Sequence, residues 1–202
     1  MPLLPGHYQR LSIHESCHAF VAARVGFWVF GMMMDGPEAN PGAVWRAHPE
    51  GKTAETARDC ARWELAVFTA GYLGEREFYN GHNEPEWVAG PDGDAAMVDY
   101  FAFQHLHTEE EEKLVGEEVR KAWVPRNEWR AKFPGLRWAE YDKLKAEVEA
   151  NVRKALKGNR DRVEALAKRL LADGHVRGKD VYDILGLKWH GKTRTVPWQE
   201  FP

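Results

Sequence analysis

The chain has 202 residues, 44% of them hydrophobic, and a formal net charge of -3. A chain of this length can bury one hydrophobic core, as one domain or as one domain with an appendage. Acidic and basic residues are well mixed and the net charge is small, so the chain offers no attraction for nucleic acid or an anionic membrane. The longest apolar run, residues 26–34, is too short to span a membrane. The chain has two cysteines, too few for a disulfide framework, and its N-terminus does not read as a secretory signal, so we expect a cytoplasmic protein.

The first predicted helix, residues 7–25, carries the most informative motif of the chain, and Gly26 is its C-terminal stop. His14, Glu15 and His18 form HExxH, in which two histidines four residues apart share one helix face and can hold one zinc ion (Zn²⁺). Glu15 lies near the metal without binding it, where it can take a proton from a zinc-bound water. A surface helix that carries the motif by accident is the alternative. Because the histidines fall on the inward, apolar stripe, we favour the metal site.

A small antiparallel unit is predicted next. Residues 27–34 and 42–47 are β-prone, and residues 35–41 between them are rich in turn formers. We expect a β-hairpin or small sheet. Its exposed strand could pair with an extended peptide by strand addition, or the hairpin could be purely structural.

A second helix, residues 53–79 with Thr53 as N-cap, contains a stretch of small residues that allows close packing on another helix. The small residues are Ala66, Ala70, Gly71 and Gly74. Glu75 follows them at a distance from HExxH where some zinc hydrolases place a carboxylate ligand. It is one candidate for third ligand, and its alternative role is that of a supporting or surface carboxylate.

A second candidate for third ligand opens the next helix. Residues 82–90 form a predicted loop, after which Asp92 is a candidate N-cap and a helix runs to about His107. Asp94 in the first turn could complete a His-His-Asp site and leave the fourth zinc position for water. Its ordinary role would be a favourable charge near the helix N-terminus.

Four further helices are expected. Thr108 and Glu111 form a capping box that starts a helix ending near Trp123, and the aromatic stretch 129–138 is either a loop over the core or a substrate lid. The next predicted helix, residues 141–156, is stopped by Gly158. Asn159 caps the helix after it, residues 159–174, whose apolar stripe includes Leu171. The last predicted helix is residues 179–185. Residues 188–202 read as an extended tail.

Residues 186–193 match the phosphate-binding expression GxxxxGK[ST], which works only between a strand and a helix. Only nine residues follow, Pro197 among them, so the helix and the remaining sheet of a nucleotide-binding domain have no room. We therefore reject nucleotide binding.

Several segments follow one another in the same order as in the protease domain of the FtsH family, and in this respect the chain resembles that domain. Members of the family are ATP-dependent zinc metalloproteases with a mostly helical protease domain. The segments are residues 11–22, the hairpin after them, residues 70–75, residues 90–94, and the helical stretches 159–167 and 181–185. This resemblance spans about residues 11–185. It implies that His14, His18 and Asp94 are the zinc ligands and Glu15 the catalytic base, which places Asp94 ahead of Glu75.

The resemblance predicts a mainly α fold with a small β-hairpin, in which residues 1–186 form the peptidase domain, residues 108–140 a divergent insertion, and residues 187–202 a tail. Family members carry membrane helices and an ATPase ahead of the protease, whereas HExxH begins here at residue 14. We therefore expect a zinc metalloendopeptidase for flexible or unfolded protein segments, or for proteins delivered by a separate ATPase. The alternatives are a non-catalytic, zinc-stabilised protein-binding module that uses the tryptophan-rich segment 123–138, and a zinc hydrolase for another bond.

Overall fold

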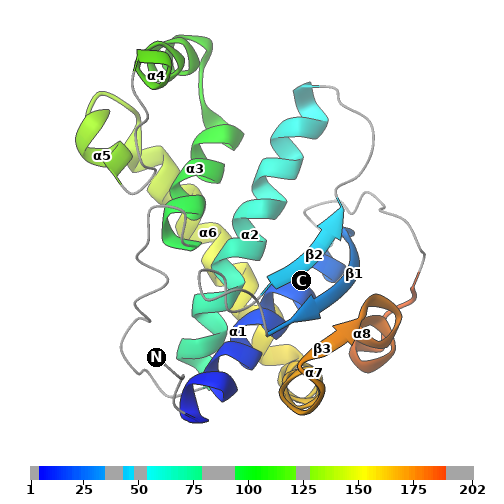
Figure 1. Ribbon diagram of the computed structural model, residues 1–202. Coiled ribbons are helices and arrows are strands. Elements are labelled where there is room, and N and C mark those ends of the chain that lie inside the picture. The colour runs from blue at the N-terminus through cyan, green and yellow to red at the C-terminus, as the bar shows by residue number, and fades with distance from the viewer. Residues whose placement is uncertain (1–4, 35–42, 48–53, 79–93, 122–127, 190–202) are drawn as a thin grey trace.

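The computed structural model describes residues 5–34, 43–47, 54–78, 94–121 and 128–189, which form helices around a small sheet (Figure 1). The helices are α1 (Pro5–Arg24), α2 (Ala54–Phe78), α3 (Asp94–Leu106), α4 (Glu109–Lys121), α5 (Trp129–Lys132), α6 (Trp138–Gly158), α7 (Arg160–Asp173) and α8 (Gly178–Leu185). The strands are β1 (Trp28–Met33), β2 (Ala43–Ala47) and β3 (His175–Arg177). The predicted mainly α fold with a β-hairpin after the HExxH helix is confirmed.

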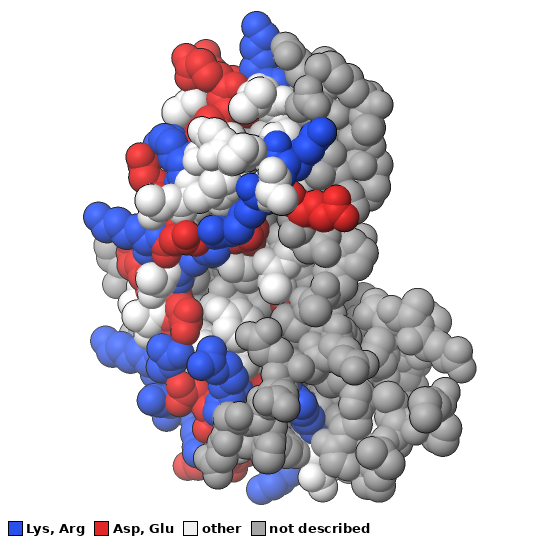
Figure 2. All heavy atoms as spheres, turned by 90° about the vertical axis from the view of Figure 1, so that its left-hand side faces the viewer, with Lys and Arg blue, Asp and Glu red and all other residues white. Residues whose placement is uncertain are grey.

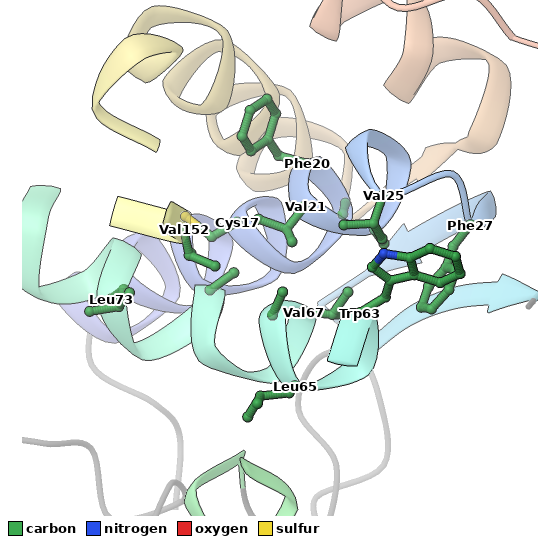
Figure 3. Close-up of a cluster of buried hydrophobic side chains, with 14 of the residues drawn as sticks. Cys17, Phe20, Val21, Val25, Phe27, Trp63, Leu65, Val67, Leu73 and Val152 are labelled. Carbon is green, nitrogen blue, oxygen red and sulfur yellow. The ribbon is translucent and has the colours of Figure 1, made fainter. Parts of the chain in front are cut away.

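Helix α1 lies at the centre of the molecule, with α2 packed along it (Figure 1). Figure 3 shows Cys17 and Val21 of α1 facing the side of α2 that carries Val67 and Leu73. These four side chains are fully buried. Every residue from 14 to 23 of α1 is buried, so this helix lies in the core.

The small residues predicted on the second helix explain how closely it approaches α1. A Cβ atom placed on Gly74 would lie 2.1 Å from the sulfur of Cys17. Only glycine therefore fits at this contact between α2 and α1.

The sheet has the strand order β2-β1-β3 and is antiparallel throughout. The predicted hairpin pairs Trp28 with Ala47 and Met33 with Ala43. Strand β3 joins the other edge of β1, and the sequence pattern did not predict it. Three residues are too few to show an alternating pattern, and their pairing partner lies far away in the sequence.

The segment predicted as a divergent insertion is tied to the helical core. The predicted capping box is confirmed, because Glu111 accepts a bond from the Thr108 amide at 2.9 Å and its own amide donates to the Thr108 hydroxyl at 3.3 Å. Trp129 and Phe133 are buried, and the Trp129 ring centroid lies 5.4 Å from that of Phe103 on α3. Residues 129–138 therefore pack on the core. They differ from the predicted loop, because residues 129–132 form the short helix α5 and α6 begins at Trp138.

Three details of the C-terminal helices differ from the prediction. Helix α6 begins at Trp138 and includes Gly158. The Asn159 side chain does not cap α7, because its amide donates to the Ala155 carbonyl of α6 at 3.0 Å. Leu171 is 40% exposed, so it lies off the buried stripe of α7. The left-handed Gly174 (φ 72°) does end α7 as predicted.

The predicted caps Thr53 and Asp92, the loop 82–90 and most of the predicted tail lie outside the described residues. None of the described helices is both long and apolar enough to cross a lipid bilayer. On the face drawn in Figure 2, lysines and arginines are interleaved with aspartates and glutamates.

Candidate metal centre

Helices α1 and α3 bring the three predicted ligands together at one point. The Nε2 atoms of His14 and His18 lie 2.9 Å apart, and Asp94 Oδ2 lies 2.9 Å from the first and 3.1 Å from the second. Both histidines are buried, and Asp94 is 15% exposed. These residues form a group that could hold a metal ion.

The spacing fits a tetrahedral metal. Two ligand atoms bound to one zinc ion at about 2.0–2.1 Å lie roughly 3.3 Å apart, and the three observed separations come within about 0.4 Å of this value. The site therefore needs only a small expansion to accept the ion.

The outer nitrogens of both imidazoles are held by acceptors. His18 Nδ1 lies 2.6 Å from the Val67 carbonyl oxygen, and His14 Nδ1 lies 2.6 Å from Glu75 Oε1. A carbonyl or carboxylate oxygen only accepts, so each Nδ1 carries a proton and each Nε2 presents a lone pair to the centre. Two such lone pairs 2.9 Å apart require a proton or a metal cation between them.

Glu75, the reserve candidate for third ligand, lies on the other side of His14. Its carboxylate accepts from His14 Nδ1 and also bonds the Arg10 guanidinium. A carboxylate in this position orients a ligating histidine and increases its basicity. The structure thus gives Glu75 a supporting role and leaves the central position to Asp94.

The electrostatics of the centre favour a cation. Burial lowers the pKa of His14, but the bonds to Asp94 and Glu75 and the charges of Asp94 and Glu15 raise it to about 10. Burial raises the pKa of Asp94, yet the two histidines hold it far below its usual range. A proton therefore occupies the centre when nothing else does, and metal binding would release it.

Gly71 brings the α2 backbone against the metal-facing atoms. A Cβ atom at this position would lie 2.5 Å from His18 Nε2 and 2.7 Å from His14 Nε2. The sequence predicts only a helix-packing role for Gly71. Its contact with both imidazoles depends on how α2 crosses α1, which no local pattern specifies.

Glu15, the predicted base, is 6% exposed beside the two histidines. Burial raises its pKa, although its electrostatic interactions with His14, His18 and Arg46 act in the opposite direction. A raised pKa brings a carboxylate closer to the range in which it can both take and return a proton near neutral pH.

Arg46 of β2, which the sequence analysis did not single out, also belongs to this neighbourhood. It forms an ion pair with Glu64 of α2 at 2.6 Å and lies over the Phe68 ring, 5.2 Å from its centroid. The Phe68 ring in turn packs edge-on against His18.

No protein-family model matches the chain, and no curated protein sequence matches it significantly. The resemblance to the FtsH protease domain therefore stays a prediction from the sequence.

Proposed function

We propose that this protein is a zinc metallopeptidase that hydrolyses peptide bonds in flexible or unfolded protein segments. The observation that supports it best is the convergence of His14, His18 and Asp94 at 2.9–3.1 Å directly beside Glu15. Two imidazoles and one carboxylate suit zinc, and three protein ligands leave the fourth position for water or substrate, as catalytic zinc sites require.

When bound, zinc would polarise the scissile carbonyl and acidify a water molecule. Glu15 would accept a proton as the water oxygen bonds to the carbonyl carbon and the carbonyl π electrons move onto the carbonyl oxygen. It would then give that proton to the amide nitrogen as the C–N bond breaks and the C=O bond re-forms, which yields an amine and a carboxylic acid. The acid then passes its proton to the amine or to water. His14 is kept in the required tautomer throughout by Glu75.

The position of β2 supports an extended polypeptide as substrate. In the order β2-β1-β3, β2 is an edge strand, and its Arg46 reaches α2 beside the candidate metal centre. An extended segment could add to the outer edge of β2 by backbone hydrogen bonds. Folded proteins do not offer such a segment, so substrates would be flexible or already unfolded.

Cleavage of unfolded casein by wild type and by Glu15→Gln, with zinc content measured on the same samples, tests this proposal. Glu15→Gln keeps the size of the side chain and should lose cleavage by about 10²–10⁴-fold while retaining zinc. The exposed Glu147→Gln, on α6, is the control for loss of one carboxylate. Cleavage retained in Glu15→Gln would refute the mechanism.

A second candidate is a non-catalytic, zinc-stabilised binding module. The deep burial of both histidines favours it, because structural metal sites are closed. Zinc bound without hydrolysis of any unfolded protein would support this candidate, and a protein that binds no zinc would refute both.

A further inference from the structure

Arg46 is held in place by contacts on two sides. Its Nη2 donates to Glu64 at 2.6 Å, and its guanidinium stacks over the Phe68 ring one helical turn further along α2. The arginine side chain is only 17% exposed, and Glu64 only 4%. A planar cation fixed in this way has little freedom to reorient.

These contacts connect the cation to the candidate metal centre through one aromatic ring. Phe68, under the guanidinium, lies 6.1 Å from the His18 ring, centroid to centroid. The positive charge of Arg46 also acts on the buried Glu15 carboxylate. The Phe68 ring thus lies between Arg46 and the metal-ligand candidate His18, although Arg46 belongs to the neighbouring strand β2.

Part of the guanidinium is not used by these contacts. Its Nε is buried and has no hydrogen-bond partner among the described residues. Glu64 takes one of the five N–H donors, and the positive charge is permanent because arginine does not deprotonate.

We propose that Arg46 is a further catalytic residue, whose guanidinium stabilises the negative charge that develops on the carbonyl oxygen of the scissile peptide bond. This inference rests on the proposed function. Attack of water on the carbonyl carbon moves the π electrons of the C=O bond onto oxygen, and they return to form the C=O bond again when the amine leaves. A cation already fixed nearby lowers the energy of the charged state without reorganising.

The simpler role for Arg46 is an anchor that ties β2 to α2 through Glu64. An anchor would affect stability and peptide binding, but it would not distinguish the charged transition state from the neutral substrate. Comparing a transition-state analogue with an uncleaved peptide therefore separates the two roles.

The probe is a phosphinic analogue of a casein peptide that wild type cleaves, in which a PO₂⁻–CH₂ unit replaces the scissile CO–NH. Its affinity is measured by calorimetry on zinc-bound wild type, Arg46→Met and Arg46→Lys. Arg46→Met removes the arginine that pairs with the buried Glu64 carboxylate, so Arg46→Met/Glu64→Gln is included as a variant that lacks this carboxylate as well. Arg62→Met, which removes a similarly buried arginine paired with Glu147, is the matched control.

We expect Arg46→Met and the double variant to lose affinity for the analogue by about 100-fold, and Arg46→Lys to recover part of it. The affinity of the uncleaved peptide, measured in the Glu15→Gln background, should change by less than about threefold. Arg62→Met should bind the analogue as wild type does.

Equal losses for analogue and peptide, or no loss, would overturn the role of Arg46 while Glu15-dependent cleavage by wild type remained. If wild type neither cleaves casein nor shows dependence on Glu15, the proposed function itself fails and the inference falls with it.

Discussion

Replacing Gly71 with alanine should damage metal binding far more than folding. The added Cβ would lie 2.5 Å from His18 Nε2, 2.6 Å from His14 Cε1 and 2.7 Å from His14 Nε2. Carbon and nitrogen atoms in contact normally lie about 3.5 Å apart, so both imidazoles must move by roughly 1 Å. The displaced atoms are the ones that would bind the metal.

The effect on stability should be small because two contributions oppose each other. Alanine in a helix interior is favoured over glycine by about 0.5–1 kcal/mol, whereas overpacking a core costs about 1–3 kcal/mol. The net loss should be at most about 2.5 kcal/mol. Misplacing two of the three ligands should weaken zinc binding by at least about 100-fold. This matches the largest loss of metal affinity expected when a residue that hydrogen-bonds to a metal ligand is mutated.

Zinc affinity, measured by competition with a chromophoric chelator, and thermal unfolding of the metal-free protein test this prediction together. Gly158→Ala in α6 is the control, because a Cβ there meets nothing within 4 Å. It should leave zinc affinity unchanged. Wild-type zinc affinity in Gly71→Ala would show that the imidazoles do not face α2 as described.

Three further predictions concern the support of the centre and the capping box. Glu75→Gln should weaken zinc binding by about 10–100-fold in the same competition assay, because His14 Nδ1 loses its carboxylate; unchanged affinity would remove Glu75 from the site. The pKa of His14 is raised from 6.5 to about 10 in the metal-free protein, so this group's contribution to stability is complete below pH 6.5 and is lost as pH rises toward 10. Denaturation followed from pH 6 to 10 should show metal-free stability falling and apparent zinc affinity rising, and the opposite trends would contradict the assignment of this proton. Thr108→Ala should lower the free energy of unfolding by about 1 kcal/mol in urea, and no change would mean that the capping box is dispensable.

The sequence predicted what local spacing can encode. HExxH on an apolar helix face specified His14, Glu15 and His18, and the capping box specified the start of α4. Gly74 was expected at a close helix contact and lies against Cys17. Each of these features depends on residues within one or two helical turns.

The missed features depend on how distant elements meet. Strand β3 exists because β1 offers it a free edge, and the carboxylate of Glu75 meets His14 only after α2 has packed on α1. Arg46 acquires its neighbours only when β2 is placed beside α2. Spacing alone could not decide whether Asp94 or Glu75 is the third ligand. The resemblance to the FtsH family favoured Asp94, and the structure places Asp94 beside His14 and His18.

A zinc titration of the metal-free protein, followed by the rate of casein cleavage, tests the central claim most directly. The rate should rise in proportion to zinc and reach a plateau at one equivalent. Glu15→Gln should bind the same equivalent of zinc without cleaving casein. Cleavage independent of zinc, or equal plateaus for wild type and Glu15→Gln, would contradict a peptidase centre built from His14, His18, Asp94 and Glu15.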